Sequence, residues 1–196
     1  MWNFKTPGIP DEFFERTEKV PITKEEVRAI QISKARLRPG QLVYDIGCGS
    51  GSISVEAAIQ VESSGKVLAI DYDKNAIELT KKNIEKFELS NVSLIYGNAK
   101  EKIIELESAD AIFIGGTGSD TAEIVEMCQD KLEVGGRIVI GTILIETLYT
   151  ILQILDKLQF NSVDITQVTI SKSRKTSTGT MMLARNPVTI ISATKS

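Results

Sequence analysis

The sequence predicts an α/β fold in which a mostly parallel central sheet is covered by helices on both faces. Short apolar runs alternate with helical stretches along residues 42–158, which indicates strand–helix units and a parallel sheet. The strands are continuous apolar runs, as burial on both faces requires. Beyond residue 160 the alternation ends. Two β-rich segments, 161–172 and 180–193, predict an antiparallel pair that closes one edge of the sheet.

The individual elements follow from local signals. Residues 1–22 are expected to form an irregular arm. They contain several aromatic residues, and their apolar residues show little helical or strand periodicity. Thr23 and Glu26 have the spacing of a capping box, which predicts a helix with Thr23 as its N-cap. This helix is expected to end near residue 37, before Pro39-Gly40. The strands expected after it are 42–46, 66–70, 92–96, 111–114 and 137–140, and the helices are about 51–61, 73–87 (capped by Asp73), 100–106, 120–132 and 146–158.

Length and composition exclude several function classes. A chain of 196 residues fits one domain, residues 1–196. A net charge of −3 disfavours broad nucleic-acid binding, which needs a basic surface. With no histidine and only two cysteines, the chain excludes Ser-His-Asp and Cys-His mechanisms and disfavours a zinc site, so we expect no metal.

The apolar stretch 138–155 raises the question of a membrane span. Gly141, Glu146 and several threonines interrupt it, so we interpret it as a buried strand followed by a helix. The N-terminus has no basic segment followed by an apolar one, and therefore no signal peptide is expected. We expect a cytoplasmic protein without membrane association.

A glycine-rich turn follows the first expected strand, in the run VYDIGCGSGSISVE (43–56). Three glycines there allow unusual dihedrals and let a ligand lie against the backbone. The free N–H groups of the next helix suit a carboxylate or phosphate. The spacing is G-x-G-x-G, and Ser52 occupies the position of the third glycine of the dinucleotide fingerprint. The turn therefore predicts a nucleoside ligand rather than a nicotinamide dinucleotide.

Two further signals lie at the ends of the next strands. Asp71 ends the second strand about twenty residues beyond the turn, where a carboxylate accepts hydrogen bonds from ribose hydroxyls. The third strand is followed by Gly97-Asn98-Ala99. This order of motifs resembles motifs I and II and the adenine-contacting segment of the class I S-adenosylmethionine-dependent methyltransferases. A tight turn with a helix-capping Asp71 is the purely structural interpretation, and the three signals together disfavour it.

Other stretches are similar to one family, the cobalt-precorrin-6B methyltransferases. They are G8-IPDEFF14 with V20-PITKEEVR28, I114-GGTGSD120 with G135-GRIVIGTILIET147, and G179-TMMLARNPVTII191. The similarity spans nearly the whole chain. It implies methylation of carbon-15 of a corrin precursor in cobalamin biosynthesis, linked to decarboxylation of the ring-C acetate, with S-adenosylmethionine as cofactor. It also implies a homotetramer and a tetrapyrrole substrate.

The resemblance implies that the cofactor contacts Thr23, Gly47, Cys48, Gly49, Ser50, Gly51, Asp71, Asn98 and Ala99. The substrate carries several carboxylates, which cations would bind. The candidate residues are Lys24, Arg28, Lys172, Arg174, Lys175 and Arg185, with Gly116 in the open turn after the fourth strand. Each of Lys172, Arg174 and Lys175 is also explained by a solvated hairpin loop. Glu146 is an acid near the site that a helix cap or solvent exposure would also explain. We name no catalytic base.

The sequence alone leaves three alternative functions open. A tRNA or protein methyltransferase would share the cofactor motifs, but an RNA enzyme is expected to have a basic surface and an added substrate module. A non-catalytic partner subunit would be expected to have lost the glycine turn or Asp71. A nicotinamide dehydrogenase is disfavoured by the turn spacing and the antiparallel edge.

Overall fold

The computed structural model describes residues 2–196 and all of their side chains except that of Ser119. Within these residues, seven strands form one sheet in the order β3-β2-β1-β4-β5-β9-β6. Five strands run parallel: β1 (Leu42–Ile46), β2 (Lys66–Asp71), β3 (Val92–Tyr96), β4 (Ala109–Ile114) and β5 (Leu132–Thr142). Strand order reverses between β1 and β4, so the carboxyl ends of these two strands mark the expected ligand site.

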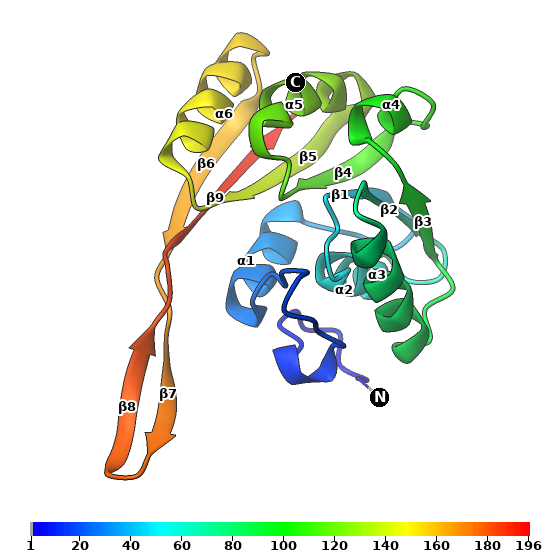
Figure 1. Ribbon diagram of the computed structural model, residues 1–196. Helices are drawn as coiled ribbons and strands as arrows, with labels where there is room; N and C mark the ends of the chain where they lie inside the picture. Colours follow the sequence, from blue (N-terminus) through cyan, green and yellow to red (C-terminus); the bar gives the residue numbers. More distant parts are fainter. Residues whose placement is uncertain (1) are drawn as a thin grey trace.

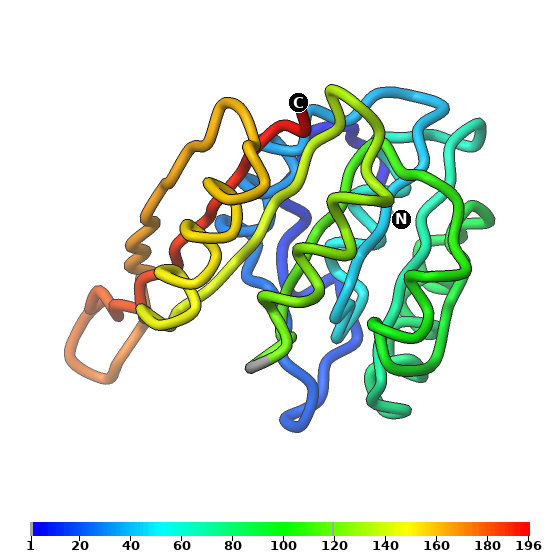
Figure 2. The backbone as a smooth tube through the Cα atoms, turned by 90° about the horizontal axis from the view of Figure 1, so that it is seen from above, coloured from blue at the N-terminus to red at the C-terminus, as the bar shows by residue number. Residues whose placement is uncertain are grey.

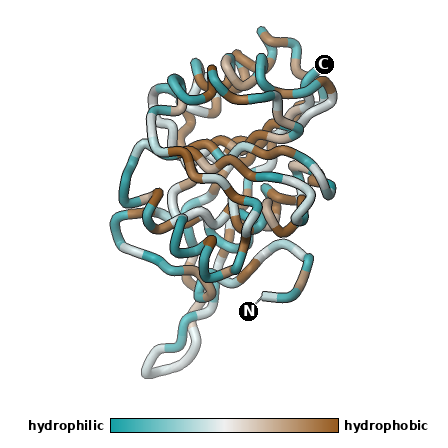
Figure 3. Tube along the Cα trace, turned by 90° about the vertical axis from the view of Figure 1, so that its right-hand side faces the viewer, coloured by the Kyte–Doolittle hydropathy of each residue, from teal (hydrophilic) through white to brown (hydrophobic). Residues whose placement is uncertain are grey.

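Helices cover both faces of the sheet, which confirms the predicted layers (Figure 1). One face carries α1 (Glu25–Ala35), α2 (Ser52–Val61) and α3 (Lys74–Lys86), and the other carries α4 (Ala99–Ile103), α5 (Thr121–Lys131) and α6 (Ile145–Lys157). Successive strand residues point to opposite faces. Val43 packs in the core with α1 and α2, and Tyr44 packs in the core with α5 and α6. Figure 3 shows the hydrophobic segments gathered at the centre of the molecule.

The C-terminal region differs from the prediction of a single antiparallel pair. Strand β9 (Val188–Thr194) pairs antiparallel with β5 and with β6 (Asn161–Val168), as expected. Residues 171–176, for which the sequence indicated the end of a β-rich segment and a solvated hairpin loop, instead form β7 (Ser171–Thr176), which pairs with β8 (Gly179–Ala184) in a separate hairpin. This hairpin projects away from the main sheet (Figures 1 and 2). Cross-strand bonding thus orders residues that polar composition alone marked as a loop.

The predicted capping box at Thr23 is wrong. Helix α1 begins at Glu25 with Lys24 as its N-cap residue, and the Lys24 side chain makes no capping hydrogen bond among the described residues. Instead, Asp11 of the short 3-10 helix η1 (Asp11–Phe13) accepts a hydrogen bond from the Glu25 backbone N–H at 3.0 Å. The arm therefore provides the cap that local sequence was expected to provide.

The apolar stretch 138–155 is divided as predicted between the end of β5 and α6. Strand β5 begins earlier than expected, at Leu132, because this buried residue pairs with Ala109 ahead of a register shift. Along residues 2–196, no helix has the length and apolar character needed to cross a bilayer.

Candidate functional site

The glycine-rich turn connects β1 to α2 at the point where strand order reverses. Gly47, Gly49 and Gly51 have φ values of 72°, 55° and 73°, in the left-handed region that favours glycine. A Cβ on Gly47 would lie 1.8 Å from the carbonyl oxygen of Gly115, which follows β4. The turn therefore needs glycine for its own dihedrals and for its close approach to the neighbouring strand end.

Helix α3 holds this turn in place through two buried polar side chains. The Thr80 hydroxyl donates to the Gly49 carbonyl at 2.9 Å, and Asn83 Nδ2 donates to the Ser50 carbonyl at 2.8 Å. Both side chains are buried on the helix face that also carries Ala76 and Leu79. Neither residue is among the site residues predicted from the sequence. The available signal was a pair of polar residues, three positions apart, on an otherwise apolar helix face.

Asp71 ends β2 beside the turn. Its Oδ2 accepts a hydrogen bond from the Gly49 N–H at 2.9 Å, and its Oδ1 accepts one from the Asp73 N–H at 2.9 Å. These bonds fix the carboxylate and leave each oxygen a further lone pair. Asp73 caps α3 by accepting from the Asn75 N–H, which confirms the predicted cap.

Asp45 is a second carboxyl group behind the turn. It is buried and accepts a hydrogen bond from the Ser54 hydroxyl of α2. Burial raises its pKa to about 7, the Ser54 hydrogen bond opposes this rise, and the nearby Asp71 charge adds to it. Asp45 thus has a strongly perturbed pKa next to the ligand site.

A cleft of about 280 Å³ opens at the carboxyl ends of the central strands. Six of the predicted site residues line it: Gly47, Gly49, Asp71, Asn98, Ala99 and Gly116. The predicted contacts at Thr23, Cys48, Ser50 and Gly51 are not among its lining residues. The Cys48 thiol instead lies 3.6 Å from the Thr80 hydroxyl, and the Ser50 side chain is buried. Cys48 and Ser50 therefore belong to the turn itself but lie on its side away from the cleft.

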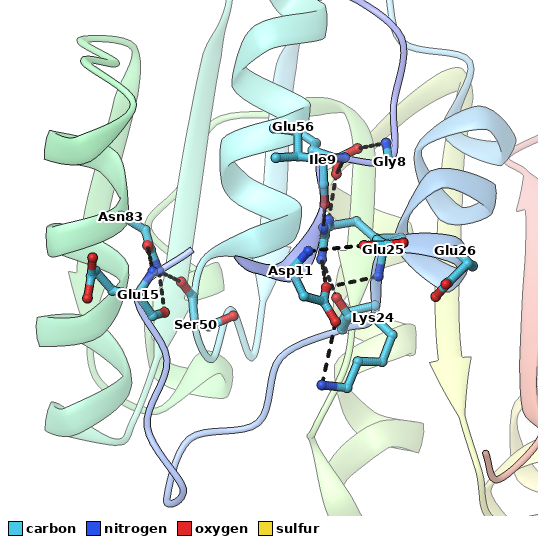
Figure 4. Close-up of polar contacts among 12 residues, drawn as sticks. Gly8, Ile9, Asp11, Glu15, Lys24, Glu25, Glu26, Ser50, Glu56 and Asn83 are labelled. Atoms are coloured by element: carbon cyan, nitrogen blue, oxygen red, sulfur yellow. Dashed lines mark hydrogen bonds and ion pairs between the residues drawn. The ribbon is translucent and has the colours of Figure 1, made fainter. Parts of the chain in front are cut away.

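The arm lines the cleft opposite the strands, through Lys19, Val20 and Pro21. A Cβ on Gly49 would lie 3.2 Å from the Pro21 carbonyl oxygen, so the arm approaches the turn closely. Asn83 also exchanges hydrogen bonds with the Glu15 backbone, accepting at 2.7 Å and donating at 3.2 Å (Figure 4). The same side chain therefore orders the turn and the arm.

The prediction that Arg28 binds substrate is contradicted by its environment. Its side chain is 0% exposed, its Nε donates to Glu56 at 2.5 Å, and its Nη1 lies 3.4 Å from Asp11. Its guanidinium also donates to the backbone carbonyls of Ile9 and Thr23. The Glu56 carboxylate in turn accepts from the Gly8 and Ile9 N–H groups (Figure 4). Arg28 therefore joins the arm to α1 and α2 and is closed to substrate.

The other candidate cations lie outside the cleft. Lys172 is paired with Glu25 and Glu26, and Lys24 with Asp11. Arg174 and Lys175 are exposed on β7, on a strand rather than the loop considered from sequence. Arg185 follows β8, and its Nη1 is buried without a partner among the described residues. Glu146 is solvent-exposed in the first turn of α6. Solvent exposure therefore explains this residue, as considered from the sequence.

The strand order, the glycine turn and the acidic residue at the end of β2 define this chain as a class I methyltransferase. Residues 12–195 match the family model described as "Precorrin methyltransferase domain". The chain belongs to that family.

Curated relatives match along almost their whole length. A protein of Saccharolobus solfataricus is 48% identical over 196 residues, 99% of this chain and 98% of the relative. One of Sulfurisphaera tokodaii is 50% identical over 188 residues, 95% of this chain and 97% of the relative. Both are named probable cobalt-precorrin-6B C(15)-methyltransferase (decarboxylating).

Solved structures agree with the fold and the family. The precorrin 8W decarboxylase of Methanobacterium thermoautotrophicum is 36% identical with a TM-score of 0.89, over 94% of this chain and 98% of that one. The precorrin-6y C5,15-methyltransferase of Geobacter metallireducens is 33% identical with a TM-score of 0.89, over 97% of this chain and 98% of that one.

Proposed function

We propose that this chain transfers the methyl group of S-adenosylmethionine to carbon-15 of cobalt-precorrin-6B and decarboxylates the ring-C acetate side chain. The near full-length similarity to relatives of that name supports the reaction. The observation that carries the proposal is the cleft in which Asp71, Asn98 and the glycine turn meet, at the strand-order reversal.

The charge of the cleft fits S-adenosylmethionine. Asp71, Asp73 and Asp120 line it, with Lys19 as a cation from the arm. The cofactor carries a sulfonium, an ammonium and a carboxylate, so its net charge is positive and complements an acidic cleft. Asp71 would accept from the ribose hydroxyls, and Asn98 and Ala99 would border the adenine. Lys19 would face the cofactor carboxylate.

The cofactor supplies an electrophilic methyl group on sulfur. Held beside Gly47 and Asp71, the cofactor would offer this methyl group to an electron-rich ring carbon of the substrate, with the electron pair of the S–CH₃ bond left on sulfur. The protein's residues orient these partners and exclude water rather than form a covalent intermediate. In the decarboxylation, the electron pair of the broken C–CO₂ bond passes into the conjugated ring, and the remaining carbon takes up a proton.

The first experiment is calorimetric titration with S-adenosylhomocysteine, with NAD as the parallel ligand. We expect binding of the first alone. An assay with cobalt-precorrin-6B and S-adenosylmethionine then follows methyl incorporation and CO₂ release. Binding of NAD alone would overturn the cofactor assignment, whereas cofactor binding without turnover of this substrate would overturn the assigned reaction.

We also propose that the protein is a homotetramer that uses the β7–β8 hairpin. The hairpin projects from the main sheet (Figure 1). On β8, Met181, Met182 and Leu183 are 47%, 62% and 47% exposed. Such an exposed apolar edge favours pairing between chains. Light scattering of the wild type and of a Met182→Asp variant tests this. A tetramer in the wild type and smaller species in the variant are expected, and a wild-type monomer would contradict the proposal.

A further inference from the structure

A second cleft, of about 160 Å³, adjoins the cofactor cleft. It is formed by residues 114–118 after β4, residues 140–144 at the end of β5, and Thr121 and Thr147 from the first turns of α5 and α6. The two clefts share Gly116 and Thr117. A molecule in the second cleft would therefore lie directly beside one in the first.

The walls of the second cleft are uncharged. Within the described part of the chain, every residue that lines it is a glycine, threonine, isoleucine or leucine. This contrasts with the cofactor cleft, which contains three aspartates and a lysine. Placing a carboxylate among uncharged side chains is costly unless hydrogen bonds compensate fully. The second cleft thus favours the uncharged part of a ligand.

Gly115 has no structural requirement for glycine within this chain. Its φ lies outside the left-handed region, and a Cβ at this position would meet no atom of the described residues within 4 Å. Gly47, by comparison, needs both its dihedral and its missing side chain. The space above Gly115 is open to the second cleft, so a bound molecule can lie against the backbone there.

The apolar rim of this cleft is formed by its lining residues Ile143 and Leu144, which Ile145 and, one helical turn later, Tyr149 follow in the chain. They are 65%, 53%, 79% and 63% exposed. Single exposed apolar residues are common, but here three exposed apolar residues follow one another in sequence, and two of them line the cleft. Such a patch suits the face of a large conjugated ring.

We propose that the second cleft and its apolar rim bind the conjugated ring of the tetrapyrrole at its reacting edge, with the ring lying over Gly115 and against Ile143. This rests on the proposed function and assigns its substrate site. The acidic side chains that do not react stay outside the uncharged cleft, which selects the orientation that brings a ring carbon toward the cofactor cleft at Gly116. Specificity arises from shape and exclusion of charge rather than from an arginine clamp at Arg28.

The first test fills the space above Gly115. Because Gly115→Leu places its Cβ in open space at an ordinary φ, the variant should keep its melting temperature. We expect the KM for cobalt-precorrin-6B to rise at least about tenfold, from lost shape complementarity. The Kd for S-adenosylhomocysteine should stay within about twofold, since Gly115 does not line the cofactor cleft.

The second test removes apolar contact at the rim. Ile143→Ser should raise the same KM about tenfold, because the substrate would no longer bury an isoleucine side chain on binding. The matched control is Val134→Ser. Val134 is 78% exposed on β5 and lines neither cleft, so its KM should be unchanged.

The outcomes separate this inference from the function on which it rests. Wild-type turnover with an unchanged KM in both Gly115→Leu and Ile143→Ser would overturn the inference alone. Loss of S-adenosylhomocysteine binding in Gly115→Leu would also overturn it, because the residue would then belong to the cofactor cleft. A wild type that binds no S-adenosylhomocysteine would overturn the proposed function and this inference with it.

Discussion

Arg28 Nε donates to Glu56 Oε1 across 2.5 Å, and both side chains are almost completely buried. The pair joins α1 to α2, and through Ile9 and Asp11 it joins both helices to the arm. The arm then continues to Lys19, Val20 and Pro21, which line the cofactor cleft. A buried ion pair that lines neither cleft is thereby connected to one wall of the site.

Arg28→Met should lower the free energy of unfolding by about 3–5 kcal/mol, because it leaves Glu56 buried without its cation. Urea unfolding measures this. Arg174→Met is the control, since it removes the same charge from an exposed strand residue and should cost less than about 0.5 kcal/mol. A raised substrate KM with unchanged stability in Arg28→Met would contradict the structural role.

Gly51→Ala should destabilise the protein by about 1–3 kcal/mol. The residue has a φ of 73°, and its Cβ would lie 2.5 Å from Thr80 Cγ2. Adding Thr80→Ser removes that methyl group and keeps the hydroxyl that bonds to Gly49. The double variant should recover part of the loss in thermal melting. Equal melting temperatures for Gly51→Ala and the wild type would show that the turn relaxes without strain.

Asp71→Asn should raise the Kd for S-adenosylhomocysteine about 10- to 100-fold, because hydrogen bonds to a charged acceptor each contribute about 1.5–3 kcal/mol. Calorimetry gives the value. Asp130→Asn, on the exposed side of α5, removes an equal charge outside the cleft and should leave the Kd unchanged. Similar affinity in both variants would exclude a ribose contact at Asp71.

Asp45 predicts a pH dependence of stability. Burial raises its pKa from 3.8 to about 7, so the folded chain holds this proton more tightly than the unfolded chain. The contribution of Asp45 protonation to the free energy of unfolding is therefore fully present below about pH 4. It is lost as the pH rises toward 7. The melting temperature of Asp45→Asn should change less with pH across this range than that of the wild type. Parallel curves for the two proteins would mean that Asp45 does not titrate there.

The sequence by itself determined the layered α/β fold, the glycine turn and the position of Asp71 at a strand end. These features depend on periodicity within one element or on short covalent spacing, which a single chain displays directly. Gly47, Gly49 and Asp71 necessarily come together, because parallel strands end at the same edge of the sheet.

Only the tertiary structure decided the remaining features. Asp11 caps α1 in place of Thr23, Arg28 is buried rather than available to substrate, and Lys19 lines the cleft. The hairpin strand β7 forms where composition indicated a loop. Each of these outcomes depends on contacts that the local sequence does not specify. Burial and hydrogen-bond satisfaction across the fold override local preference at those positions.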